Sequence, residues 1–330
     1  MTLIPILAVI LALAIDFAIG DPRNKYHPTV WIGTLIGKLV PLTRSTKTNL
    51  EKIGGFVLVI SITVLVSIFI FAFCFGLQQL EHLNLSSLPQ ILVTIITVLS
   101  VGILLKTTIA IKGMEEHASK IMNALSKMDL NDAREKLSMI VKRNTKDLDR
   151  PHIISATLES ISENTVDGIT GPLFYFAIFG LVGSFVYRTI NTIDSMVGYK
   201  TDLFRNIGWF GANCDKILNF VPSRLTSLIM ILASMCVTGH WKRSLDIMRR
   251  DGSKTESPNA GYPMATMAGA LGVRFEKLDH YNLGEDISEL SEKHIKTAIS
   301  IMRTTAILFA MLFTIPMIVL LSYLGWWIFV

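Results

Sequence analysis

The sequence has few charged residues and few cysteines, and each shortage excludes a class of protein. Only 17% of its 330 residues are charged, whereas 51% are hydrophobic, and this balance is too apolar for a soluble domain of this size. The three cysteines, Cys74, Cys214 and Cys236, form no C-x-x-C pair, so we expect buried thiols and neither a disulfide framework nor a zinc site. The composition predicts an integral membrane protein.

Several functional motifs are absent as well. The chain contains no G-x-x-x-x-G-K-[ST] phosphate loop, no G-x-G-x-x-G, no H-E-x-x-H and no G-x-S-x-G, which argues against the common nucleotide-binding folds, zinc proteases and serine hydrolases. We expect no zinc and no haem. The net charge of +5 comes from Lys and Arg in a few loops, without a basic stripe interleaved with aromatic residues, so nucleic acid is not an expected partner.

Long apolar runs dominate what is present. They cover about residues 1–20, 53–80, 87–111, 172–187, 225–239 and 304–330. They predict an all-α integral membrane protein, a multi-pass helical bundle of about 4–6 membrane segments, as a single membrane-embedded domain over residues 1–330. The first run lacks a basic leader and a cleavage site, so we expect a retained helix in which Asp16 is either functional or close to interfacial water.

The distribution of Lys and Arg predicts the orientation in the membrane. These residues gather in 21–52, 112–169 and 240–302, whereas the link at 81–86 has none. The positive-inside rule therefore places the three basic regions in the cytoplasm and the link outside. The runs at 172–187 and 225–239 are shorter than the roughly 20 residues of a full span, so we expect short, tilted or re-entrant segments there.

The polar regions also contain helix signals. Residues 112–150 carry apolar side chains at helical intervals and predict one or two amphipathic cytoplasmic helices, separated by a capping signal at Asp129. Pro151 fits the first turn of the next helix, which we expect to stop near Gly168, Gly171 and Pro172. The run at 304–330 predicts one final transmembrane helix with an aromatic belt.

The helix after Pro151 carries three carboxylates four residues apart, Glu159, Glu163 and Asp167. At 3.6 residues per turn they project from one face, where each like-charge pair costs about a few tenths of a kcal/mol. A divalent metal ion, a basic partner or plain solvation of an exposed face would each accommodate the row.

Three further polar clusters lie among turn-forming residues. They are Gly20–Pro22 with His27–Pro28, Asn191–Tyr199, and Ser257–Pro263. Backbone amides in such turns can bind anions, although ordinary turn formation explains the same residues. His27 is either an acid–base group or a helix cap.

Isolated charged residues complete the set of candidates. Asp194 and Asp215 offer acceptors for a hard cation, and Arg143, Arg188 and Arg224 offer donors that suit phosphate, carboxylate or interhelical salt bridges. Together these residues predict a membrane-embedded cytoplasmic site for a polyanionic ligand, with Mg²⁺.

At these clusters the sequence resembles the cobinamide-phosphate synthase family of cobalamin biosynthesis, CbiB/CobD. The matching pieces are Gly20-Asp21-Pro22 with His27-Pro28, Arg143-Asn144-Thr145, Ala156 through Glu163-Asn164-Thr165-Val166-Asp167-Gly168 to Phe174, Tyr187 through Tyr199, Gly208-Trp209, Asn219 through Leu225, Ser257 through Gly261, and Ala268 through Val273. They follow the order of the family and span nearly the whole chain.

The resemblance implies a multi-pass enzyme of the cell membrane whose active site faces the cytoplasm. The implied reaction is the ATP-dependent formation of an amide between adenosylcobyric acid, a corrinoid, and aminopropanol or aminopropanol phosphate. The lipid bilayer is the implied setting, and a homo-oligomer or a complex with other enzymes of the pathway is compatible with it.

In that setting the candidate residues acquire roles. The expected catalytic residues are Glu159, Glu163, Asp167, Asp194, Asp215 and His27, with Mg²⁺ held by Glu159, Glu163 and Asp167. The expected substrate- or phosphate-binding residues are Asp21, Arg143, Asn164, Asn191, Ser195, Arg224, Ser257, Asn259 and Gly261. The alternatives are an AmpE-like membrane sensor without ligase activity, and a transporter that binds cations at Asp16 and the Glu159 row.

Overall fold

The computed structural model describes residues 3–82, 90–199 and 201–326. Its contacts divide the chain into two compact units, each assembled from separate stretches of sequence. Unit 1 contains residues 1–110, 171–218 and 310–330, and unit 2 contains residues 111–170 and 219–309. The expected single domain over residues 1–330 stays a prediction.

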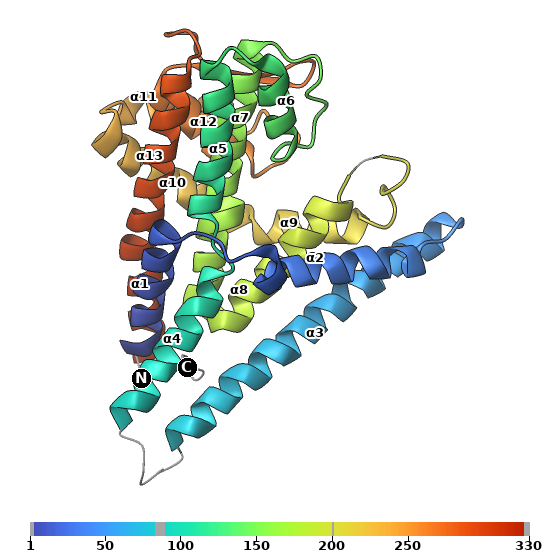
Figure 1. Ribbon diagram of the computed structural model, residues 1–330, viewed down its shortest axis with the longest axis vertical. Coiled ribbons are helices and arrows are strands. Elements are labelled where there is room, and N and C mark those ends of the chain that lie inside the picture. Colours follow the sequence, from blue (N-terminus) through green and yellow to red (C-terminus); the bar gives the residue numbers. More distant parts are fainter. Residues whose placement is uncertain (1–2, 83–89, 200, 327–330) are drawn as a thin grey trace. The chain divides into compact units, whose positions relative to one another are not determined.

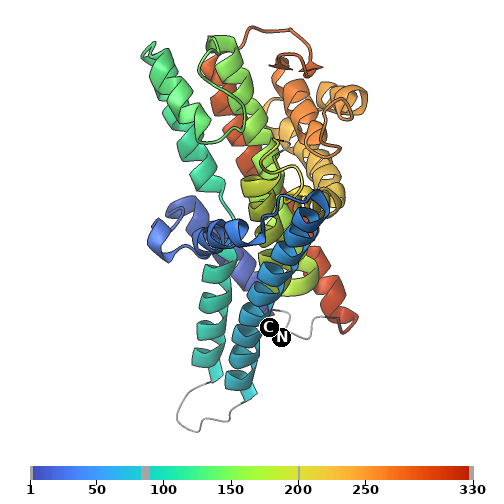
Figure 2. The same ribbon diagram turned by 90° about the vertical axis from the view of Figure 1, so that its right-hand side faces the viewer.

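Unit 1 is built from long apolar helices and short connecting ones (Figure 1). Its elements are α1 (Leu3–Ala18), η1 (Asn24–Tyr26), α2 (Pro28–Leu39), η2 (Val40–Thr43), α3 (Thr48–His82), α4 (Gln90–Lys106), α8 (Gly171–Val197), α9 (Trp209–Leu218), η4 (Ala310–Thr314) and α14 (Ile315–Tyr323). α1 packs along α4, and α3 lies beside α4, α8 and α9. Figure 2 shows α3 and α4 side by side.

α8 is two helical arms folded against each other. Gly180 interrupts the helix with φ 63° and ψ −155°, a combination that essentially only glycine adopts. The rings of Tyr175 and Tyr187 stack with centroids 5.1 Å apart, and Gly183 packs against the carbonyl of Tyr175. Because the paired positions converge on Gly180 from both sides, residues 171–197 form a helical hairpin.

Unit 2 packs its helices around α7 and α13. Its elements are α5 (Ile111–Ser126), α6 (Leu130–Ser138), α7 (Arg150–Thr165), the π-helical turn η3 (Val166–Thr170), α10 (Phe220–Val237), α11 (Trp241–Asp251), α12 (Gly261–Leu271), β1 (Arg274–Lys277), β2 (Tyr281–Gly284) and α13 (Glu292–Phe309). The strands form an antiparallel hairpin with Phe275 opposite Leu283, and both of these side chains are buried. β1 contacts α7, and β2 contacts α12.

The fold class is confirmed. In the described part of the chain, five helices are long and apolar enough to cross a membrane: Thr48–Leu80, Gln90–Ser126, Arg150–Val197, Phe220–Val237 and Glu292–Tyr323. α1 is a shorter apolar helix of 16 residues. The chain is thus a multi-pass helical membrane protein, to which the structure adds the small β1–β2 hairpin.

Several local predictions are also confirmed. The carboxylate of Asp129 accepts a hydrogen bond from the amide of Asp132 and caps α6, which separates α5 from α6 as expected. Pro151 lies in the first turn of α7. The fold-back at Gly180 makes a hairpin of the region that contains 172–187, whereas the expected short, tilted or re-entrant course of this segment in a membrane stays a prediction.

Other predictions need correction. The helix after Pro151 does not stop near Gly168, Gly171 and Pro172, because the π turn η3 leads it into α8. The final helix begins at Glu292 and not near 304, since the amphipathic turns of α13 continue into the apolar run. Most of the expected external link at 81–86, and the last residues of the aromatic belt at 327–330, lie outside the described residues.

Candidate functional site

The centre of unit 2 is a buried carboxylate with three polar partners. Glu159 lies on α7 and its side chain is 3% exposed. Arg143 donates to Oε2 of Glu159, the hydroxyl of Tyr281 donates to the same oxygen at 2.7 Å, and Ser155 donates to Oε1 at 2.8 Å. A buried charge with this many donors is compensated, so Glu159 is held in one position.

The three partners come from different elements: Ser155 from α7 itself, Arg143 from the loop before α7, and Tyr281 from β2. Ser155 lies one turn before Glu159 on α7, and its hydroxyl also accepts the amide of Glu276 from β1 at 2.8 Å. Arg143 lies in the loop between α6 and α7, which Thr145 fixes by donating to the carbonyl of Arg134 at 3.0 Å. Tertiary contacts, and not the helix alone, therefore set the geometry around Glu159.

Tyr281 is a hydrogen-bond donor in this cluster. Burial, together with the adjacent negative charge of Glu159, raises the pKa of the Tyr281 hydroxyl far above its usual range. The phenol is therefore neutral at physiological pH and keeps its hydrogen for the carboxylate.

The three carboxylates of α7 do not share one environment. Glu159 is buried in the cluster above, Glu163 is exposed, and Asp167 is half-buried within the π turn. In the described part of the chain, no three His, Cys, Asp or Glu side chains gather as a metal-binding group. Carboxylates suit Mg²⁺, which commonly takes one or two of them together with substrate phosphates, and the metal role of Glu159, Glu163 and Asp167 stays a prediction.

A second cluster of unit 2 surrounds Arg224 on α10. Its guanidinium lies over the ring of Phe220 at 3.7 Å and over that of Tyr262 at 4.5 Å, and it donates to Oδ1 of Asn259 at 3.2 Å. It also donates to the carbonyl of Pro258 at 3.3 Å. Arg224 thereby fastens the 257–261 loop to α10.

The 257–261 loop prepares the start of α12. The hydroxyl of Ser257 accepts the amides of Asn259 at 3.4 Å and Ala260 at 3.3 Å. Gly261 leaves room for the carbonyl of Gly252, which a Cβ would meet at 2.4 Å. The three predicted loop residues are thus brought together, and their role in phosphate binding stays a prediction.

Unit 1 contains a series of charged side chains that begins between the apolar helices α1 and α4 and continues into the loop after α1. Lys106 at the end of α4 is 3% exposed and lies 3.1 Å from Oδ1 of the fully buried Asp16. Lys106 also donates to Asp21, whose carboxylate lies 3.6 Å from Nε2 of His27. Burial favours a higher pKa for Asp21, but the hydrogen bonds from His27 and Lys106 outweigh it and hold the pKa below its usual range.

His27 is a helix cap in this structure. Its Nδ1 accepts the amide of Thr29 at 3.2 Å at the start of α2. In the tautomer that accepts at Nδ1, the ring hydrogen lies on Nε2, which is 3.6 Å from Oδ1 of Asp21.

A second polar group of unit 1 links α8 to α9. Asn191 donates to Oδ1 of Asp215 at 3.2 Å and accepts from Arg188 at 3.4 Å. Ser195 donates to the carbonyl of Thr192 at 2.8 Å. The half-buried carboxylate of Asp215 is thus held between α8 and α9, and its role as a base stays a prediction.

The remaining predicted residues fall near these groups. Asn164 donates to the carbonyl of Ser160 at 2.9 Å within α7. Asp194 lies on the last turns of α8, where its side chain closely approaches Gly198. The predicted residues divide between the units: Asp21, His27, Asn191, Asp194, Ser195 and Asp215 belong to unit 1, and the others to unit 2.

Three residues of these clusters were not predicted from the sequence. Ser155 shares a helical face with Glu159, one turn away, and that spacing could have indicated it. Lys106 is the single charge in a long apolar run, which is a signal for a buried partner such as Asp16. Tyr281 carries no such signal, because its place depends on the β1–β2 hairpin.

Known proteins resemble this chain over almost its full length. Residues 9–309 match the family described as CobD/Cbib protein. A probable cobalamin biosynthesis protein CobD of Methanothermobacter thermautotrophicus is 36% identical over 303 residues, covering 92% of this chain and 95% of the relative. A cobalamin biosynthesis protein CobD of Clostridium acetobutylicum is 36% identical over 332 residues, covering 97% and 99%. A third, from Dehalococcoides mccartyi, is 37% identical over 298 residues, covering 89% and 91%. No solved structure matches the chain.

Proposed function

Because the chain belongs to the CobD/CbiB family of cobalamin biosynthesis proteins, we propose that it is an adenosylcobinamide-phosphate synthase. The proposed reaction joins a carboxylate of adenosylcobyric acid to the amine of aminopropanol or its phosphate. The observation that carries the proposal is the similarity to CobD proteins over nearly the full length of both chains. The relatives quoted are all named for cobalamin biosynthesis, which supports the enzyme over a regulatory or transport protein.

Amide formation from a carboxylate needs activation. In the proposed reaction the corrinoid carboxylate attacks the terminal phosphorus of ATP, which forms an acyl phosphate and releases ADP. The neutral amine then attacks the acyl carbon, the carbon–oxygen bond to phosphate breaks, and inorganic phosphate leaves. The ammonium must lose a proton before or during this attack, and a carboxylate such as Asp215 or an imidazole such as His27 has suitable chemistry to accept it.

Unit 2 offers groups suited to the phosphate chemistry. Mg²⁺ bound with ATP would offset phosphate charge, and Glu163 and Asp167 are the carboxylates that would complete its coordination. Arg143 and Arg224 supply planar, permanently charged donors that match phosphate oxygens. Glu159 is better suited to holding Arg143 than to binding the metal, because its oxygens are occupied by Arg143, Ser155 and Tyr281.

The orientation in the membrane is part of the proposal. ATP is a cytoplasmic compound, and the basic regions 112–169 and 240–302 are two of the three that the positive-inside rule assigns to the cytoplasm. We therefore propose a cell-membrane enzyme whose reacting groups face the cytoplasm.

The decisive experiment uses the purified full chain in detergent. It is given adenosylcobyric acid, ATP and Mg²⁺ with either aminopropanol or aminopropanol phosphate, and the mass of the corrinoid product is measured by mass spectrometry. We expect a product of the mass of the amide, and its absence with either amine would contradict the ligase assignment.

A matched pair of variants tests the phosphate chemistry. Glu163→Gln is expected to lower turnover about a hundredfold or more while the protein inserts and melts as the parent does. Glu135→Gln, at an exposed position of α6, is the control and is expected to keep full turnover. Unchanged turnover in Glu163→Gln would remove this carboxylate from the reaction.

A further inference from the structure

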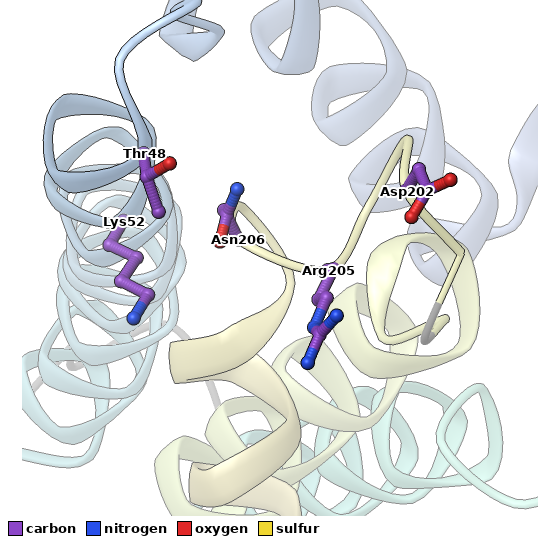
Figure 3. Close-up of a pocket in the computed structure, with 5 residues that line it drawn as sticks. All are labelled: Thr48, Lys52, Asp202, Arg205 and Asn206. Carbon is purple, nitrogen blue, oxygen red and sulfur yellow. The ribbon is translucent and has the colours of Figure 1, made fainter.

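Unit 1 contains an open polar pocket at the first turns of α3. Its volume is ≈ 430 Å³, and it is lined by Thr48, Lys52, Asp202, Arg205 and Asn206. Figure 3 shows Thr48 and Lys52 on α3 on one side, and Asp202, Arg205 and Asn206 on the segment before α9 on the other. This volume lies in the range of small-ligand sites, roughly 300–1,000 Å³.

The pocket carries a net positive charge. Lys52 and Arg205 contribute two cations and Asp202 one anion. Within residues 3–82, 90–199 and 201–326, neither Lys52 nor Arg205 lies within ion-pairing distance of a carboxylate. Their charges are therefore available to an anionic ligand.

The walls of the pocket are fixed by buried polar contacts. Glu51, beside Lys52 in the chain, is buried. Its carboxylate accepts hydrogen bonds from Arg44 at 3.4 Å and from Asn206 at 3.1 Å. Arg44 also donates to the carbonyl of Leu203. Gly55 lets the carbonyl of Ile207 approach α3 so closely that a Cβ would meet it at 2.0 Å. These contacts neutralise Glu51 and hold the 203–207 segment against α3.

An apolar surface begins immediately next to the pocket. From Ile53 onward α3 carries exposed apolar side chains at helical intervals, Ile53, Phe56, Val57, Ile60 and Val64, with exposed fractions between 42% and 57%. The candidate span that starts in α3 is the least buried of the five, at 22%. Such a face is expected to contact lipid acyl chains.

Aromatic residues mark the boundary between these two surfaces. The ammonium of Lys52 lies 5.9 Å from the ring centroid of Trp209, and Trp209 is 53% exposed. Trp residues with Lys nearby are typical of the headgroup level of a membrane. The basic pocket thus lies where an apolar helix face meets the polar region.

We propose that this pocket binds the phosphate headgroup of an anionic membrane lipid, with the acyl chains along the exposed face of α3. A phosphate matches the forked donors of Arg205 and the ammonium of Lys52. Basic pockets at membrane helices bind anionic headgroups in this way. The pocket lies outside the groups assigned to the amide reaction, so this site is separate from that activity.

Quenching of Trp209 tests the proposal on the full chain in nonionic detergent. Phosphatidylglycerol with brominated acyl chains is titrated into the micelles, with brominated phosphatidylcholine in parallel, and Trp209→Phe isolates the signal of this residue. We expect half-maximal quenching of Trp209 at a roughly tenfold lower mole fraction of phosphatidylglycerol than of phosphatidylcholine. The preference should weaken as salt is added.

Variants assign the effect to the pocket. The double variant Lys52→Gln with Arg205→Gln is expected to lose the preference, whereas Lys52→Arg with Arg205→Lys, which keeps both charges, should retain it. Lys25→Gln with Lys38→Gln, two exposed cations of unit 1 that do not line the pocket, is the matched control and should also retain it. An unchanged preference in the first variant, with an unchanged melting temperature, would overturn the proposal.

A water-soluble phosphate distinguishes the source of the ligand. Glycerol 1-phosphate is expected to compete only weakly with the brominated lipid, because it lacks the apolar contacts with α3. Tight binding of glycerol 1-phosphate without any response to phosphatidylglycerol would overturn the lipid assignment and point to a soluble phosphate compound in the same pocket.

Discussion

The ion pair between Arg143 and Glu159 allows a role in positioning to be separated from a role in catalysis. Arg143→Met removes the cation and leaves a carboxylate that is 3% exposed, with the hydroxyls of Ser155 and Tyr281 still donating to it. Leaving one partner of a buried pair uncompensated costs about 3–5 kcal/mol. Glu159→Gln is milder, because Arg143 is 18% exposed and can turn to water, and we expect about 1–2 kcal/mol.

The double variant, Arg143→Met with Glu159→Gln, removes both charges at once. The amide oxygen of the introduced glutamine would still accept from Ser155 and Tyr281, so we expect the double variant to lose less stability than Arg143→Met alone. A coupling of roughly 2 kcal/mol would follow, within the range found for neighbouring groups. Denaturant titration of the full chain in detergent measures all three free energies of unfolding.

Activity of the same double variant then decides the role of the pair. If Glu159 or Arg143 acts in the reaction, the double variant is folded but inactive in the mass assay. Full turnover in a stable double variant would restrict both residues to positioning, and an Arg143→Met variant as stable as the parent would refute the burial argument itself.

Three further predictions concern unit 1. Gly180→Ala is expected to lower the free energy of unfolding by about 1–3 kcal/mol, because the backbone there suits only glycine. The control is Gly76→Ala in α3, whose added Cβ meets nothing and which should leave the melting temperature unchanged or raise it. Equal melting temperatures of the two variants would argue against the hairpin. Lys106→Met is expected to lower stability by about 3 kcal/mol by leaving Asp16 without its cation, and adding Asp16→Asn should restore most of the loss in the same denaturant titration. The pKa of Asp21 in the folded protein lies below its ordinary value of 3.8, so its contribution to the free energy of unfolding is present above pH 3.8 and is lost as the pH falls through the folded pKa. The free energies of unfolding of the parent and of Asp21→Asn should therefore converge in acid. A constant difference between them from pH 7 to 3 would contradict this.

The hairpin of α8 determines from which of its ends the polar segment beginning at Asn191 continues. A continuous helix over residues 171–197 would carry its two ends far apart, whereas the fold-back at Gly180 keeps Gly171 and Tyr187 side by side. The polar block that begins at Asn191 therefore continues from the same end of the hairpin at which α8 starts. Irregular backbone of this kind is tolerated within a membrane protein where other helices cover it.

The sequence by itself determined the features that depend on composition and short-range pattern. The apolar runs predicted a multi-pass helical protein, the spacing of Asp129 and Asp132 predicted a helix cap, and Pro151 predicted a helix start. Residue type and spacing singled out Glu159, Arg143, Arg224 and Asn259 as candidates, and the resemblance to the CobD/CbiB family added the roles that stay predictions. Such features follow from burial in lipid and from local backbone chemistry, which a few neighbouring residues specify.

Only the tertiary structure decided how the candidate residues are paired. Helical spacing placed Glu159, Glu163 and Asp167 on one face, but the packing of β2 and of the α6–α7 loop on α7 buries the first, while the second is exposed and the third lies in a π turn. The partners Tyr281 and Arg143 stand 122 and 16 residues from Glu159, and no periodicity in the sequence encodes such contacts. They form because a buried carboxylate must find donors wherever the fold brings them within hydrogen-bond distance.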